Sequence, residues 1–198
     1  CEFYNEPGCC KNIPCSLNVE LEKSISQNAK MNEGQMSTLL GMKGNPTLAE
    51  ELMVSRDLFL AEYQNSRIHF SCISSAKSVE LIKAAKKKGL QVTADVSVNN
   101  LYFDDSALAN FDSNFKLSPP LRTKEDIKAL KQGLKEGTID AICSQHTPED
   151  LEHKQVEFEH ASEGMIGLQT AFSLSLMSLE KQMDITEIIL KWTDAPRK

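Results

Sequence analysis

The stretch that decides the fold runs from Thr138 to Pro148 and reads Thr-Ile-Asp-Ala-Ile-Cys-Ser-Gln-His-Thr-Pro. Its first part, Ile139–Ser144, carries a continuous apolar patch, as expected of a parallel strand buried on both faces. The preceding segment predicts a helix over Thr123–Lys135, since Thr123 can cap it and Asp126 follows three residues later. Gly137 stands just past the helix end, where glycine is common. A helix that leads directly into such a strand indicates a crossover unit of an α/β fold.

The same alternation occurs on both sides of this unit. Upstream, strands are predicted at Arg67–Ser74 and Leu90–Val98, separated by a helix over Ser75–Lys88, and a capped helix begins at Pro46-Thr47, with Glu50 at the capping-box spacing. Downstream, helices are predicted at Ile166–Leu179 and Ile185–Trp192. Strands that alternate with helices predict right-handed crossovers and a parallel sheet. Only three or four strands are visible, whereas a closed (β/α)₈ barrel needs eight, so a partial barrel and a small open sheet are the two candidate architectures.

Composition limits the classes of partner and compartment. The 198 residues fit one domain, and the net charge of −6 disfavours general attraction to nucleic acid or to anionic membranes. No apolar stretch approaches the roughly 20 residues of a membrane span. We therefore expect a cytoplasmic protein with no nucleic-acid or membrane partner. Because the sequence begins at Cys1 and stops directly after a helix, we also expect it to be an internal piece of a longer protein.

The cysteines fall into two groups. Cys1, Cys9, Cys10 and Cys15 crowd the first fifteen residues, whereas Cys72 and Cys143 lie in predicted strands. A zinc knot or a disulfide staple is conceivable for the first group, but the spacing does not give the paired C-x₂₋₄-C pattern, and we expect reduced thiols. We interpret Cys72 and Cys143 as small core residues. Residues 1–30 are expected to be a cysteine-rich, loop-like segment with a short helix near Val19–Ser26, and residues 31–198 the barrel part.

Several motifs, in the same order, resemble the C-terminal half of the dihydroorotases, amidohydrolases that open and close the dihydroorotate ring of pyrimidine biosynthesis. They are Met31–Gly34, Arg67–Phe70, Val92–Val96, Pro119–Arg122, Gly137–Asp140, Ser144–Pro148 and Gly164–Leu168. The resemblance implies a partial (β/α)₈ barrel whose strand ends meet at one mouth. It also implies a binuclear zinc site in active members, with an early His-x-His pair and a bridging group that would precede Cys1. For Arg122 we favour capping or ion pairing over substrate binding.

The residues at the family's functional positions differ from the family pattern. Cys72 and Gln145 occupy positions that the resemblance assigns to metal ligands, and Gln145 also replaces the carboxylate that moves the proton. Ser118 replaces an asparagine that contacts substrate, and Glu149 replaces a histidine at the pocket, while His146 is retained. An amide does not titrate near pH 7 and binds zinc poorly, so no metal ion is expected on this chain.

These departures favour a non-catalytic dihydroorotase-like protein that acts as a scaffold or regulatory partner, either of aspartate transcarbamoylase or in a homo-oligomer. The alternative is an active zinc-dependent dihydroorotase, which converts dihydroorotate to carbamoyl aspartate once an N-terminal half supplies the other ligands. A third hypothesis is a fragment without a function of its own.

Overall fold

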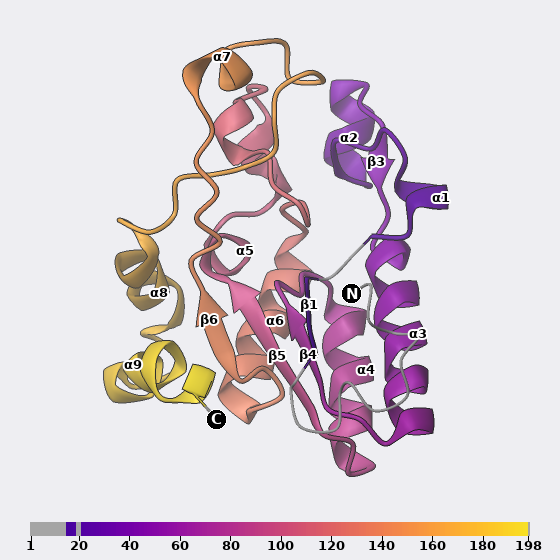
Figure 1. The fold of residues 1–198 in the computed structure, drawn as a ribbon. Coiled ribbons are helices and arrows are strands. Elements are labelled where there is room, and N and C mark those ends of the chain that lie inside the picture. The colour runs from indigo at the N-terminus through magenta and orange to yellow at the C-terminus, as the bar shows by residue number, and fades with distance from the viewer. Residues whose placement is uncertain (1–14, 19–20, 198) are drawn as a thin grey trace.

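The computed structural model describes residues 15–18 and 21–197 (Figure 1). Its strands are β1 (Cys15–Asn18), β2 (Met31–Asn32), β3 (Gly44–Asn45), β4 (Ile68–Ser71), β5 (Val92–Ser97) and β6 (Ala141–Cys143). Its α-helices are α1 (Lys23–Ser26), α2 (Gln35–Leu40), α3 (Leu48–Gln64), α4 (Ala76–Lys87), α5 (Val98–Tyr102), α6 (Lys124–Glu136), α7 (Leu151–Lys154), α8 (Ala171–Leu179) and α9 (Ile185–Thr193). Short 3₁₀ helices lie at Asp105–Leu108, Ser113–Phe115 and Ala195–Arg197.

The main sheet is parallel throughout and has the order β1-β4-β5-β6 within the described residues. This confirms that the three predicted strands are adjacent and parallel. The sheet does not close into a barrel within the part of the chain described, so the architecture is α/β and corresponds to part of a barrel. A separate parallel pair, β2 and β3, lies beyond the carboxyl ends of the main strands (Figure 1).

Local sequence signals set the ends of the two helices between the strands. The Ser75 hydroxyl accepts a hydrogen bond from the Ser78 amide at the start of α4, and Gly89, with φ of 88°, follows its end. Thr123 and Asp126 form the predicted capping box of α6, which Gly137 ends at φ 77°. Only glycine adopts these positive φ values without a steric cost, so both helices stop where predicted.

Three local expectations are wrong. Residues 15–18 form β1 and pair with β4, although a loop was expected there. Thr47 does not cap α3 with its side chain, because the Glu50 carboxylate is buried and accepts hydrogen bonds from the Ser74 and Ser75 amides. Helix α8 begins at Ala171 rather than at Ile166. In the first two cases a contact between distant segments overrides the local pattern.

The sheet and its helices enclose a continuous hydrophobic core. Strand residues such as Phe70, Ala94 and Val96 pack with Ile82 of α4 and Leu134 of α6, and all five side chains are buried. Helices α8 and α9 lie beside β6, at the opposite edge from α3 (Figure 1). A smaller cluster around Met31, Leu108 and Phe158 lies apart from this core. The core therefore holds the strand ends rigidly where the site is formed.

A buried hydrogen-bond network connects the segment before α6, the loop after β4 and the β2–β3 pair. The guanidinium of Arg122 donates to Ser74 Oγ at 3.1 Å, to Asn32 Oδ1 at 3.0 Å and to the Asn45 carbonyl at 2.7 Å. The Ser74 hydroxyl donates in turn to the buried Glu50 carboxylate. Burial lowers the pKa of Arg122, and the nearby Glu50 carboxylate acts in the opposite direction. The Arg122 side chain thus has a structural role, through hydrogen bonds to neutral groups rather than through the direct ion pair or cap that was expected.

Within the described residues, no helix is long and apolar enough to span a membrane.

Candidate functional site

A pocket of about 680 Å³ opens at the carboxyl ends of β4 and β6. Parallel strands direct the residues that follow them to the same edge of the sheet, which is where barrel proteins form their sites. The lining residues come from the ends of β4 and β6 and from the segments around α1, Pro119 and Glu163. They are Leu21, Lys23, Ser26, Ala29, Lys30, Met31, Asn45, Ser71, Cys72, Leu117, Ser118, Pro119, Pro120, Cys143, Gln145, His146, Thr147 and Glu163.

Cys72 follows β4 in a left-handed backbone conformation, with φ of 62°. This conformation is unfavourable for a residue with a side chain and persists where surrounding contacts hold it. Two hydrogen bonds to Asp95 of the neighbouring strand do so: the Cys72 amide donates to Asp95 Oδ1 at 2.8 Å, and the Ile73 amide donates to the Asp95 carbonyl at 3.1 Å. Asp95 therefore fixes the direction of the chain after β4.

Side chains of neighbouring residues hold the Asp95 carboxylate in place through hydrogen bonds. His69 Nε2 lies 2.9 Å from Asp95 Oδ2, and the Ser71 hydroxyl donates to the same oxygen at 2.9 Å. The other nitrogen of His69 lies 2.8 Å from the Thr93 hydroxyl. Burial alone raises the pKa of Asp95, but the hydrogen bonds from His69 and Cys72 outweigh it and lower the pKa overall. His69 therefore helps to orient this carboxylate.

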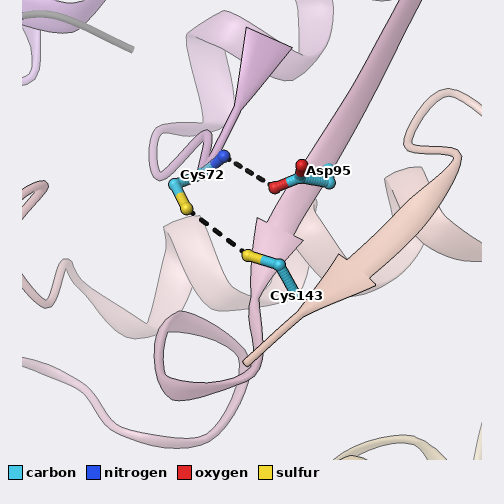
Figure 2. A group of neighbouring side chains, drawn as sticks. All are labelled: Cys72, Asp95 and Cys143. Carbon is cyan, nitrogen blue, oxygen red and sulfur yellow. Dashed lines mark hydrogen bonds between the residues drawn. The ribbon is translucent and has the colours of Figure 1, made fainter. Parts of the chain in front are cut away.

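Cys143, the last residue of β6, brings a second sulfur to the same place. Its Sγ lies 3.4 Å from Cys72 Sγ, and Figure 2 shows both thiols beside Asp95. The two thiols titrate as a pair. The hydrogen bond with Cys143 lowers the pKa of Cys72, while the same bond and burial raise the pKa of Cys143. Within the pair, the Cys72 thiol therefore loses its proton more readily than the Cys143 thiol.

Gln145 and His146 follow β6 and line the pocket with Ser118, as the strand order predicts. Gln145 also has a left-handed backbone, with φ of 45°, and its Nε2 donates to the Ser118 carbonyl at 2.8 Å. Its Oε1 is buried without a hydrogen-bond partner among the described residues. His146 Nδ1 accepts hydrogen bonds from the Gly167 and Leu168 amides, at 3.2 and 3.4 Å.

Glu149 does not belong to this group. It is exposed and is absent from the residues that line the pocket, although the sequence analysis placed it there. The Thr147 amide donates to the Met165 carbonyl at 3.0 Å, and this bond joins the loop after β6 to the segment near Gly164. The side chain of Glu149 lies beside Gly164 and outside the pocket lining.

The described residues do not fit the binuclear zinc site that the resemblance implies. Gln145 offers a neutral amide whose nitrogen is engaged with the Ser118 carbonyl, and His146 uses Nδ1 to accept backbone hydrogen bonds. A second metal ion would need further carboxylate or imidazole ligands at these positions. Of the two ligand-equivalent residues, Cys72 alone offers a strong zinc donor.

The sequence did not lead us to Asp95 as a site residue, and the role inferred for Cys143 was wrong. A carboxylate inside a predicted strand of a parallel sheet was the available signal for Asp95, because such strands are buried and buried acids are normally paired. Cys143 was interpreted as a core residue, yet it is half-buried and lines the pocket. Its position at the end of its strand, equivalent to that of Cys72, was the signal.

Comparison with curated proteins gives consistent relatives. The chain is 44% identical over 176 residues to a dihydroorotase of Syntrophus aciditrophicus, and 48% identical over 153 residues to a dihydroorotase of a Thermoanaerobacter species. These alignments cover 88% and 77% of this chain but 41% and 36% of the relatives. The chain thus spans about two fifths of the length of the relatives it matches. No family model matches it.

Solved structures support the fold. The L-hydantoinase (dihydropyrimidinase) of Arthrobacter aurescens superposes with a TM-score of 0.75 at 22% identity, over 91% of this chain and 42% of its own. The dihydropyrimidinase of Brevibacillus agri superposes with a TM-score of 0.72 at 20% identity, over 90% of this chain and 41% of its own. The sequence identity to the curated relatives places the chain, over the part that it spans, in the dihydroorotase family, and the two solved structures show the same fold.

Proposed function

We propose that the protein is a dihydroorotase-type amidohydrolase whose pocket takes up a cyclic amide of pyrimidine biosynthesis, with the remainder of the barrel supplied by sequence beyond this chain. The observation that carries this proposal is the pocket at the strand ends, which is lined by residues 117–120 and by Gln145 and His146. The identity to curated dihydroorotases over most of the chain supports it.

The charges around the pocket suit an anionic substrate. Two basic residues, Lys23 and Lys30, line the pocket, and Glu163 is the one acidic residue among the described residues that line it. Since Glu149 lies outside the lining, it does not oppose the binding of a carboxylate such as that of dihydroorotate. A small ring with a carboxylate at one end can therefore enter with that end toward the lysines.

The amide side chain of Gln145 determines how fast we expect ring opening to be. Opening a cyclic amide requires a proton to be delivered to the leaving nitrogen, and a positioned titratable group contributes about 10²–10⁴-fold to such steps. The amide of Gln145 cannot supply it. We therefore expect slow ring opening by the natural protein and faster ring opening by the Gln145→Asp variant.

The test is an assay of ring opening and ring closure between dihydroorotate and carbamoyl aspartate, with the complete protein. Gln145→Asp should raise kcat by about 100-fold, since it restores a proton carrier. Gln132→Glu is a matched control, because it makes the same kind of change on the exposed surface of α6 and should leave the rate unaltered. No turnover by either the natural protein or the Gln145→Asp variant would refute the proposal.

A second function is favoured by the way in which Gln145 is held. Its hydrogen bond to the Ser118 carbonyl joins two pocket loops and suits a protein that keeps the fold without the chemistry. Such a protein would act as a scaffold or regulatory partner, for aspartate transcarbamoylase or within a homo-oligomer. Co-purification of the complete protein, followed by sizing and identification of the partner, tests this. A monomer that turns over dihydroorotate would exclude it.

A further inference from the structure

We infer that Cys72, Cys143 and Asp95 form a binding site for one thiophilic divalent cation of the zinc class, with a further coordination position facing the pocket. The sulfur atoms and a carboxylate oxygen of these three residues lie within 4.8 Å of one another. They come from the ends of β4 and β6 and from the strand between them, as Figure 2 shows. The inference does not rest on the proposed function, because metal binding can be measured without turnover.

The distance between the two sulfurs suits a shared metal ion. A zinc ion with Zn–S bonds of about 2.3 Å and tetrahedral angles holds two sulfurs about 3.8 Å apart. The observed separation of 3.4 Å needs only a small outward movement of the thiols to reach this value. A disulfide, by contrast, requires about 2.05 Å between the sulfurs and a much larger movement.

The donor set defines the class of ion. Two thiolates select a soft or borderline cation such as zinc over magnesium or calcium, which prefer oxygen ligands. The carboxylate of Asp95 supplies the third donor and is already oriented by His69, Ser71 and the Cys72 amide. Partners of this kind, which hold a ligand in place, typically strengthen metal binding by about 10–100-fold.

The site differs from the one that the family resemblance implies. Gln145 is not a ligand, and Cys143 does not stand at a position to which the resemblance assigns a ligand. With three protein donors the ion keeps a coordination position that water or a pocket ligand can reach, since both cysteines line the pocket. Open sites of this kind are typical of catalytic rather than structural zinc.

The experiment uses cobalt and zinc with the complete chain. Cys1, Cys9, Cys10 and Cys15 are replaced by Ser in every sample, so that thiols near the N-terminus cannot contribute to the signal. After reduction and removal of the reductant under anaerobic conditions, the parent protein should bind one equivalent of cobalt with sulfur-to-cobalt charge-transfer absorption. The absorption should fall by about half in Cys72→Ser and in Cys143→Ser, because each loses one of the two metal–thiolate bonds.

Two further variants separate the roles of the neighbours. Asp95→Asn should weaken cobalt binding at least tenfold, and His69→Ala should weaken it about 10–100-fold without removing a sulfur band, as expected for a positioning residue. Ser144→Ala, next to Cys143, is the matched control and should bind as the parent does. Far-UV circular dichroism establishes that each variant is folded.

Mass-spectrometric mapping of thiol alkylation gives a second readout that any folded sample can supply. Zinc should protect Cys72 and Cys143 together in the parent, and Cys143 should lose this protection in Cys72→Ser. Equal cobalt absorption in the parent and in the Cys72→Ser/Cys143→Ser double variant would overturn the inference. So would alkylation rates of the two thiols that do not respond to zinc.

Discussion

At the scale of single residues, the strongest stability prediction concerns the buried carboxylate of Glu50. It accepts hydrogen bonds from the amides of Ser74 and Ser75 and lies in the network that holds the buried Arg122 guanidinium. Glu50→Ala should destabilise the protein by about 3–5 kcal/mol, because it leaves a buried positive charge without its compensating carboxylate. Denaturant unfolding measures this change.

Glu62 on the same helix provides the comparison. It is exposed, and its Oε2 lies 3.9 Å from Lys88 Nζ. Glu62→Gln should therefore lower the free energy of unfolding by no more than about 1 kcal/mol. If Glu50→Ala and Glu62→Gln lowered the free energy of unfolding by the same small amount, the network would not have the stabilising role assigned to it.

A second residue-scale prediction concerns Asp105, whose pKa is raised mainly by burial and further by the charge of Asp104. Because its pKa is raised in the folded state, the Asp105 carboxyl stabilises the fold fully at pH values below its ordinary pKa of about 3.9. This contribution is lost as the pH rises through the raised pKa. Asp105→Asn should therefore stabilise the protein at pH 7, since its side-chain oxygen can still accept the hydrogen bond from Asn32.

Urea unfolding of the parent and Asp105→Asn at several pH values provides the measurement. The stability difference should shrink as the pH falls toward 3, where the parent carboxyl is protonated. A difference that is constant across this range would mean that the ionisation of Asp105 is not its cause.

At the scale of elements, the contact between α4 and α6 depends on Gly133. A Cβ at this position would lie 2.9 Å from Val79 Cγ1 and 3.1 Å from Ile139 Cδ1. Alanine favours a helix over glycine by about 1 kcal/mol, but overpacking of a core costs about 1–3 kcal/mol. Gly133→Ala should therefore lower the stability, although it improves the intrinsic helix propensity of α6.

A double-mutant cycle with Val79→Ala tests the cause. Shortening Val79 removes the closest clash, so the double variant should be more stable than the sum of the two single effects by at least about 0.5 kcal/mol. Additive effects would show that Gly133 and Val79 do not restrict each other.

At the scale of the whole molecule, the main core and the small cluster around Met31 should differ in stability. Strand β5 is paired on both sides, by β4 and β6, and its residues Ala94 and Val96 are fully buried. The β2–β3 pair has two residues in each strand and rests on the smaller cluster. Hydrogen exchange should therefore be slowest in β5, at the free energy of global unfolding, and faster in β2 and β3 through local opening. Equal protection in the two regions would indicate a single cooperative unit.

Much of the fold was predictable because its signals are local. The caps at Ser75 and Thr123 and the glycines at 89 and 137 define two helices, and the apolar runs between them define the strands. Strand β1 was missed because its four residues form a strand only by pairing with β4, a contact that no local pattern encodes. Thr47 was misassigned as a cap because Glu50 is engaged by Ser74 and Ser75, residues that follow β4.

The sequence by itself determined the family, the alternation of strands and helices, and the replacement of the expected carboxylate by Gln145. The tertiary structure alone decided that Glu149 lies away from the pocket and that Cys72, Asp95 and Cys143 meet. Cys72 and Cys143 are 71 residues apart, and their sulfurs approach because β4 and β6 both pair with β5 and the chain after β4 turns at Cys72 toward Asp95 of β5. Parallel pairing brings the carboxyl ends of non-consecutive segments to one edge, so the chemistry of that edge depends on the order of strands in space rather than on spacing along the chain.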